Sequence, residues 1–174
     1  MNIKSRSLSC ALALCLGCLS HAQNPQAADI FVDRVDGITP DFIRGADVSS
    51  VLALEKSGVV FRNAAGEPAD LFEVLADHGI NSVRIRVWND PFSSAGKGFG
   101  GGNCDIDAAI AMGKRATARG LSVLLDFHYS DFWADPNKQQ EPRAWKGMSV
   151  DDKADALYKY TKDSLKKALV DHFE

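Results

Sequence analysis

The chain has 174 residues, of which 45% are hydrophobic and 25% are charged. These proportions are ordinary for a folded soluble domain, and they exclude a disordered, collagen-like or low-complexity chain. The formal net charge is −3 and the sequence isoelectric point is about 5.8. This balance argues against a nucleic-acid-binding module, because such modules carry a basic surface.

The first 22 residues have the pattern of a secretory signal peptide. Lys4 and Arg6 form a positively charged start, an apolar run covers residues 8–19, and small residues precede a cleavage point near Ala22. The run is shorter than the roughly 20 residues that a membrane-spanning helix needs. A lipoprotein signal at Cys18 is the alternative. The sequence therefore predicts a signal peptide at 1–22 and a secreted or periplasmic protein without a membrane partner after cleavage.

Residues 23–40 are polar and turn-prone, and we expect them to form a lead-in segment. Cleavage would remove three of the four cysteines and leave Cys104 alone. An internal disulfide or a cysteine-based metal site is therefore not expected.

From residue 41 onwards, strand patterns alternate with helical patterns. Strands are expected at residues 42–48, 83–88 and 122–128, and helices at 70–78, 105–119 and 150–170. Ser149, followed three residues later by Asp152, predicts a capping box at the start of the last helix. Strands and helices that alternate in this way favour a parallel α/β sheet.

The alternation within the strands favours a barrel over a doubly wound sheet. Arg84 and Arg86 share one face of the second strand, and Asp126 and His128 share one face of the third. A doubly wound sheet would bury these side chains under a helix. A barrel instead points them into an interior whose upper end opens on the active site.

The loops after the second and third strands support the same fold. They cover residues 89–104 and 129–148 and are longer than the usual roughly two to six residues. The predicted fold is a (β/α)8 TIM barrel, of which residues 41–174 supply about the first three βα units.

Several strand-end residues are candidates for chemistry. Asp47 could orient a substrate hydroxyl, or it could simply form a turn. Either Arg84 or Arg86 is expected to hold Asp47 or Asp126 in an ion pair, and a buried Arg at a strand end suits a site that keeps a carboxylate ionised.

Residues 126–136 form the densest cluster, and two chemistries fit it. In the first, histidine, tyrosine, aspartate and tryptophan side chains line a sugar-binding cleft. In the second, Asp126, His128 and Asp131 are ligands of a hydrolytic metal ion. If these residues have no function, His128 is a hydrogen-bonded core histidine and the aspartates hold the loop in place as caps. The glycine-rich run at 96–102 lacks the spacing of a phosphate loop, so it predicts a flexible or closely packed loop.

Taken together, several runs resemble the endo-β-1,4-galactanases of glycoside hydrolase family 53. They are GADVS at 45–49, RIRVWNDP at 84–91, GGGN at 100–103, DFHYSDFWADP at 126–136, and Pro142 with Trp145. The runs occur in family order over residues 40–170. The resemblance implies a hydrolase that cleaves β-1,4-galactosidic bonds of galactan or type I arabinogalactan, a pectin side chain, with retention of configuration.

The resemblance also implies a set of substrate-binding residues: Asp47, Arg86, Trp88, Asn89, His128, Tyr129, Asp131 and Trp133. Arg86 would lie beside the catalytic carboxylates, and His128 would contact the sugar at the scissile bond. The implied partner is the polysaccharide alone, without nucleic acid, and the complete protein is expected to be a monomer. No cofactor is expected, apart from a possible structural calcium ion in the half of the barrel that this chain does not cover.

The catalytic glutamates depart from the family pattern. In the family, the acid/base glutamate follows an asparagine at the end of the fourth strand, and the nucleophile ends the seventh. The chain ends at Glu174, where the fourth strand would begin, and Glu55, Glu67, Glu73 and Glu141 match neither role. Retaining hydrolysis needs two carboxyl groups about 5–5.5 Å apart.

We therefore expect this polypeptide, as a truncated galactanase, to be inactive alone. An incomplete barrel would also expose an apolar layer and strand edges, so poor solubility is expected. A metal-dependent barrel hydrolase and a non-catalytic galactan-binding decoy are the alternatives.

Overall fold

A computed structural model describes residue 33 and residues 35–172. The chain divides into two units, Met1–Ile38 and Thr39–Glu174, and the following description concerns the second. The expected signal peptide and most of the lead-in lie outside the described residues. Within the described part of the chain, no helix combines the length and apolarity needed to cross a membrane.

A parallel three-stranded sheet forms the centre of this unit. Its strands are β1 (Gly45–Asp47), β2 (Ser82–Val87) and β3 (Ser122–Phe127), in the order β1-β2-β3. The register places Asp47 beside Arg84, and Arg86 beside Asp126. The carboxyl ends of the strands therefore bring these charged side chains to one end of the sheet.

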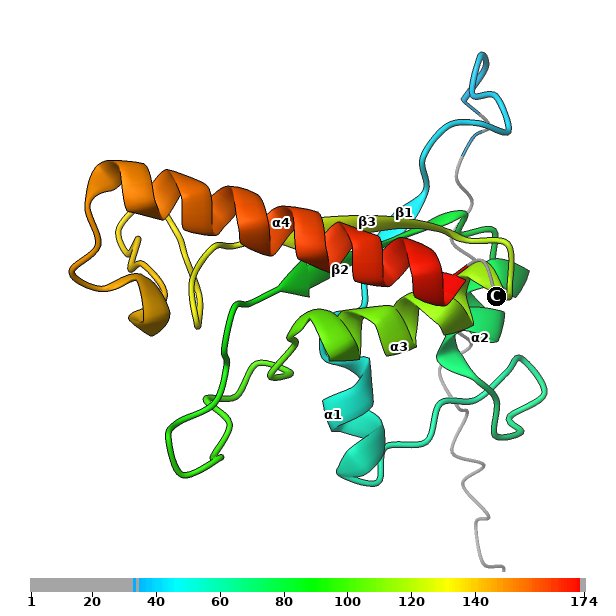
Figure 1. Cartoon of the computed structure of the whole chain (residues 1–174). Helices are drawn as coiled ribbons and strands as arrows, with labels where there is room; N and C mark the ends of the chain where they lie inside the picture. Colours follow the sequence, from blue (N-terminus) through cyan, green and yellow to red (C-terminus); the bar gives the residue numbers. More distant parts are fainter. Residues whose placement is uncertain (1–32, 34, 173–174) are drawn as a thin grey trace, which may run out of the picture. The chain divides into compact units, whose positions relative to one another are not determined.

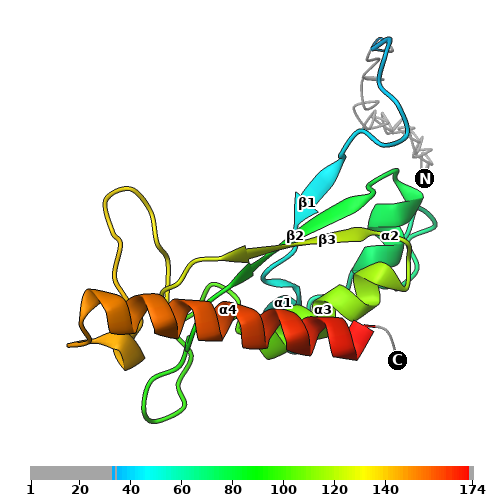
Figure 2. The same ribbon diagram turned by 45° about the horizontal axis from the view of Figure 1, so that its top comes forward.

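The helices follow the strands in the order expected of βα units. They are α1 (Val51–Lys56) and α2 (Leu71–Asp77) after β1, α3 (Ile106–Thr117) after β2, and the 3-10 turn η1 (Arg143–Trp145) and α4 (Val150–His172) after β3. Helices α1, α3 and α4 lie on the same side of the sheet (Figures 1 and 2). This arrangement confirms the predicted fold, the first three βα units of a barrel.

The core lies between the sheet and these helices. Val83, Ile85 and Val87 project from one face of β2 and are fully buried. They belong to one apolar cluster with residues of the helices, including Phe72 of α2 and Met112 of α3. The opposite face of the sheet carries the charged side chains, as the strand alternation predicts for a barrel.

The first strand is shorter than predicted. Only Gly45–Asp47 pair with β2, and the expected residues 42–44 lie outside the strand. At residues 42–44, hydrogen bonds from the Asn81 side chain take the place of backbone pairing between strands. This side chain accepts a hydrogen bond from the Arg44 backbone N–H and donates one to the Phe42 carbonyl. The Phe42 side chain is largely exposed, so no buried apolar contact favours continuing the strand through residue 42.

The sequence reasoning missed helix α1. This helix has six residues, and no side chain caps its start at Ser50. Tertiary contacts hold it, because Val51 is buried in the core and Glu55 forms a bidentate ion pair with Arg115 of α3. Arg115 also donates to Asp70, which caps α2, and thus ties three helices together.

The other predicted helix starts are confirmed. Asp70 caps α2 by accepting from the Phe72 N–H, and Asp105 caps α3 by accepting from the Ala108 N–H. The Ser149 hydroxyl accepts from the Asp152 N–H, which is one half of the predicted capping box, and it donates to the Asp152 carboxylate.

Candidate functional site

Arg84 joins the carboxyl ends of all three strands. Its Nη1 lies 2.9 Å from Asp47 Oδ2, and its Nη2 donates to Asp126 Oδ2. The ion pair predicted from the sequence is therefore present, and Arg84 forms it with both carboxylates. Since Arg84 is in the central strand, its two contacts fix the outer strand ends relative to one another.

His128 extends this chain of contacts toward the aromatic residues. Its Nε2 lies 3.3 Å from Asp126 Oδ2, and its Nδ1 lies 3.2 Å from Trp88 Nε1. The indole N–H can only donate, so His128 Nδ1 accepts and the ring proton resides on Nε2. Burial lowers the pKa of His128, and nearby Asp126 opposes this only in part. The geometry and the pKa both favour a neutral imidazole.

Asp47 is held in an ionised state at the end of β1. Its Oδ1 accepts hydrogen bonds from the backbone N–H and the hydroxyl of Ser49. Burial alone would raise the pKa of Asp47, but the Ser49 hydrogen bonds and the positive charges of Arg84 and Arg86 outweigh it and lower the pKa. Asp47 therefore forms a turn with Ser49 and also presents an ionised carboxylate at the end of β1.

Arg86 is buried between two tryptophans. Its guanidinium carbon lies 4.4 Å from the centroid of the Trp88 ring and 4.0 Å from that of Trp133. Its Nη2 donates to the Gly101 carbonyl, whereas its Nε is buried without a hydrogen-bond partner. Burial lowers the pKa of Arg86, and the charge of Asp47 works against this shift.

The glycine-rich loop passes close to this cluster. A Cβ on Gly101 would lie 2.9 Å from Trp88 Cη2, and one on Gly102 would lie 2.6 Å from the Ser49 carbonyl oxygen. Both glycines have positive φ. The loop is therefore closely packed at 101–102, one of the two possibilities that the sequence left open.

Three predicted site residues make contacts away from the Arg86 cluster. Asn89 lines a different cavity, beside Trp145 and Tyr160. Tyr129 adopts a positive φ of 49° and its hydroxyl hydrogen-bonds Thr161 of α4, but the residue also lines one cavity with Asp126 and His128. The predicted contacts of Asn89 and Tyr129 with substrate stay predictions.

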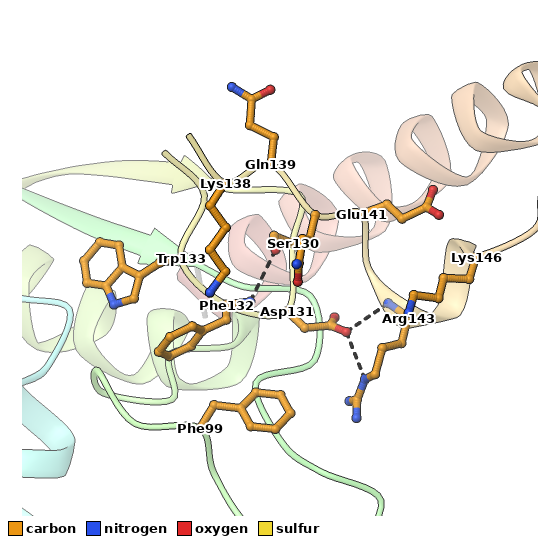
Figure 3. A pocket seen from close by; sticks show the side chains of 11 residues that line it. Phe99, Ser130, Asp131, Phe132, Trp133, Lys138, Gln139, Glu141, Arg143 and Lys146 are labelled. Atoms are coloured by element: carbon orange, nitrogen blue, oxygen red, sulfur yellow. Dashed lines mark hydrogen bonds and ion pairs between the residues drawn. The ribbon is translucent and has the colours of Figure 1, made fainter. Parts of the chain in front are cut away.

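Asp131 is the third of these residues, and it joins the two long loops. It is buried, accepts from the Asp90 N–H, and binds the Arg143 backbone N–H and Nε at 2.9 and 3.0 Å. Arg143 also lies 2.8 Å from the Asp90 carboxylate and donates to the Phe92 carbonyl. Figure 3 shows the Arg143 side chain directed at Asp131.

Two cavities open beside the site. The strand-end cavity has a volume of about 570 Å³, and its lining includes Arg84, Asp126, His128 and Asp135. The loop cavity, of about 910 Å³, lies between the loops after β2 and β3 (Figure 3). Both volumes fall in the range of about 300–1,000 Å³ that is typical of small-ligand pockets.

The structure does not assemble the metal site considered from the sequence. Asp126 and His128 are neighbours, but the Asp131 carboxylate binds Arg143 and the Asp90 N–H instead. Among the described residues, no group of three histidine, cysteine, aspartate or glutamate side chains is placed to hold a metal ion. Cys104 is buried, and burial raises the pKa of its thiol to about 12.

Sequence reasoning left some residues of the region out of the site. Arg84 and Asp126 were considered for an ion pair or a metal site but were not among the predicted substrate-binding residues, although both line the strand-end cavity. Phe99 and Phe132 extend the aromatic cluster from Trp88 into the loop cavity. Aromatic residues within a long loop were the available signal for these two.

The fold and the site define a class of protein. A parallel sheet covered by helices, with charged and aromatic side chains gathered at the strand carboxyl ends, is the arrangement in which (β/α)-barrel enzymes place their active sites.

Comparison with known proteins narrows this class. The profile of Glycosyl hydrolase family 53 matches residues 43–172. The chain is 55% identical over 149 residues to an endo-beta-1,4-galactanase of Bacillus subtilis, covering 86% of this chain and 35% of that one. It is 44% identical over 124 residues to an arabinogalactan endo-beta-1,4-galactanase of Thermothelomyces thermophilus, covering 71% and 35%.

Solved structures agree with the sequence relatives. The GH53 catalytic domain of Ignisphaera aggregans superposes with a TM-score of 0.79 at 39% identity, over 82% of this chain and 39% of that domain. A structure of fungal beta-1,4-galactanases gives a TM-score of 0.64 at 42% identity, over 73% and 36%. The chain belongs to glycosyl hydrolase family 53. It spans about a third of the length of the curated relatives it matches.

Proposed function

We propose that this chain supplies the first three βα units, and one wall of the substrate cleft, of a secreted endo-β-1,4-galactanase. The enzyme would hydrolyse β-1,4-galactosidic bonds of galactan or type I arabinogalactan with retention of configuration. One observation carries the proposal: in a chain of family 53, the ends of three adjacent strands present a continuous set of contacting polar and aromatic side chains.

The side chains at the strand ends suit recognition of a sugar. Trp133 exposes 42% of its surface beside the buried Arg86, and an exposed indole can stack on the apolar face of a pyranose. His128 and Asp126 lie in the adjoining strand-end cavity, where neutral imidazole and carboxylate groups can hydrogen-bond sugar hydroxyls. The relatives named above are galactanases, so galactose is the proposed sugar.

The contacts of Arg86 favour a position beside a carboxylate. Within the described residues it makes no ion pair, and its Nε lacks a hydrogen-bond acceptor. A buried guanidinium with a free donor can stabilise an ionised carboxylate. We propose that a catalytic carboxylate outside the described residues binds there.

The described glutamates do not supply the catalytic pair. Glu55 and Glu73 belong to helices and pair with Arg115 and Arg119. Glu67 lies in the turn before α2, and Glu141 pairs with Lys153. None of the four ends a strand, so the 174-residue polypeptide alone is expected to release no reducing sugar from galactan.

A hybrid enzyme tests the proposal. Residues 39–172 would replace the matching segment of the Bacillus subtilis relative, and reducing sugar released from β-1,4-galactan would be measured. We expect hydrolysis at a rate comparable to that of the unaltered Bacillus enzyme, with the β-anomer formed first in NMR spectra because the mechanism is retaining. A folded hybrid that leaves galactan intact, or that forms the α-anomer first, would contradict the proposal.

Export is a separate part of the proposal. It rests on the pattern of residues 1–22 alone, and expression of the chain with those residues in a bacterial host tests it. We expect the product in the periplasm or medium with its new N-terminus near Gln23.

A further inference from the structure

The loop cavity combines aromatic surfaces with positive charge. Phe99, Phe132 and Trp133 contribute rings to its lining, and Phe99 and Trp133 are each exposed to 41–42%. The rings of Phe99 and Phe132 meet edge to face, 6.3 Å apart. Lys138 lies above this surface, with its Nζ 5.5 Å from the Phe132 ring centroid (Figure 3).

The negative charges of the loop cavity are already neutralised. Asp131 is bound to Arg143, and Glu141 lies 2.5 Å from Lys153. Lys138 and Lys146 line the same cavity, and neither forms an ion pair with any residue that the structure describes. The cavity therefore keeps two ammonium groups for an incoming anion.

The strand-end cavity has the opposite character. Its one arginine, Arg84, is bound to both Asp47 and Asp126. Asp135 adds a carboxylate that forms no ion pair within the described part of the chain. An anionic ligand is thus disfavoured in the strand-end cavity and favoured in the loop cavity.

The two cavities are adjacent. Gln139, Gln140 and Glu141 contribute to the lining of both. A chain of linked sugars that occupies the strand-end cavity can therefore continue into the loop cavity, past a segment that offers amide hydrogen bonds.

We propose that the loop cavity is a binding site for a uronic acid residue of an oligosaccharide. The exposed rings would contact the apolar face of the pyranose, Lys138 beside the Phe132 ring would bind its carboxylate, and Lys146 would add positive charge to the cavity. The inference rests on the proposed function, because it takes the adjoining cavity to hold a neutral sugar chain. It assigns to the enzyme a preference for substrate that carries acidic sugars beside the neutral galactan.

Titration with two probes tests this site. Trigalacturonate and neutral β-1,4-galactotriose would be titrated into the 174-residue chain and into the hybrid enzyme. At low ionic strength we expect trigalacturonate to bind at least about fivefold more tightly, and the difference to vanish near 0.5 M salt because exposed charges are screened. If the 174-residue chain alone folds poorly, the titration of the hybrid enzyme still decides the result.

Charge-removing variants locate the site. Lys138→Gln with Lys146→Gln should weaken trigalacturonate binding by about five- to tenfold and leave galactotriose binding unchanged. The matched control, Lys56→Gln with Lys114→Gln, removes two exposed charges on α1 and α3 and should change neither affinity. Phe99→Leu should weaken binding of trigalacturonate without altering its salt dependence.

The outcomes separate this inference from the proposed function. Equal binding of both probes at low salt, or a Lys138/Lys146 variant that binds trigalacturonate as the unaltered protein does, overturns the uronate site. A hybrid that binds trigalacturonate through these lysines but fails to hydrolyse galactan contradicts the proposed function and leaves the site standing.

Discussion

At the residue scale, Gly101 sets how closely the loop after β2 approaches the tryptophans. Its φ is +61°, and its missing side chain leaves room for Trp88 and for Trp133 Nε1, which would lie 3.3 Å from a Cβ at this position. Its carbonyl also accepts a hydrogen bond from Arg86. One residue thus combines a left-handed conformation, a close approach and a contact with the buried cation.

Gly101→Ala is therefore expected to disturb the Arg86 cluster. The added methyl group must displace the Trp88 ring, and we expect a loss of about 2–4 kcal/mol in the free energy of unfolding. Gly96→Ala is the matched control, because Gly96 also has positive φ but nothing lies within 4 Å of its Cβ position. The control should cost about 1 kcal/mol. Denaturant unfolding followed by near-ultraviolet circular dichroism measures both, and equal losses would contradict this account.

His128 gives the stability a defined pH dependence. Its pKa in the folded chain lies below the unfolded value of about 6.5. Between these two values the unfolded chain binds more protons, so the free energy of unfolding falls as pH decreases below about 6.5 and this effect ends below the folded pKa. His128→Asn should remove that part of the slope, whereas His78→Asn, on the exposed end of α2, should retain it. Thermal unfolding across pH 5–8 provides the measurement, and identical slopes for the two variants would refute the prediction.

At the element scale, the long loops after β2 and β3 are held by side chains. Arg143 contacts Asp131 within its own loop and Asp90 and the Phe92 carbonyl in the other, and its guanidinium carbon lies 5.3 Å from the Phe99 ring centroid. Loops without regular hydrogen bonding depend on such contacts for a fixed shape. The loop cavity depends on this shape because both loops line it.

Arg143→Ala should release the two loops from each other. It would leave the buried Asp131 carboxylate without its cation, at a cost of about 2 kcal/mol in the free energy of unfolding. We expect faster amide hydrogen exchange at Asp90 and Phe92, and unchanged exchange in β2. Arg119→Ala, which removes the exposed pair with Glu73, should cost less than about 1 kcal/mol and leave loop exchange unaltered. Protected loop amides in Arg143→Ala would contradict this role.

The elements also show what the sequence could predict. The period-2 alternation of β2 and β3 correctly predicted that Asp126 and His128 are neighbours, because a strand fixes the direction of each side chain. Helix α1 was missed because six residues carry little periodic signal and contacts such as Glu55–Arg115 hold it. The Arg86–Trp133 stacking was also missed, since it depends on the path of a loop that no local pattern specifies.

At the scale of the whole molecule, apolar side chains remain exposed on α4. Tyr158, Leu165 and Leu169 are 43–64% exposed, whereas Ser164 and Ala168 are buried. The more apolar side of this helix therefore lies away from the core. Leu124 on the inner face of β3 is also 57% exposed. Within the described residues, β1 and β3 each have one edge without a strand partner.

The 174-residue chain is therefore expected to self-associate. Exposed apolar patches and unpaired strand edges favour association, so we expect oligomers in size-exclusion chromatography and binding of a hydrophobic dye. Leu165→Gln with Leu169→Gln should reduce both, while Lys162→Gln with Lys166→Gln should reduce neither. A monomer that binds no dye would show that this surface does not drive association.

If the strand ends of this chain form part of a galactan-cleaving site, replacing His128 should impair cleavage itself. The measurement is kcat/KM for a β-1,4-galacto-oligosaccharide in the hybrid enzyme with His128→Asn, compared with His78→Asn. If the imidazole contacts the sugar at the scissile bond, His128→Asn should lower kcat/KM by at least about 100-fold while the melting temperature stays near that of the unaltered hybrid. His78→Asn should leave kcat/KM unchanged. A folded His128→Asn hybrid that retains the kcat/KM of the unaltered hybrid would contradict the account.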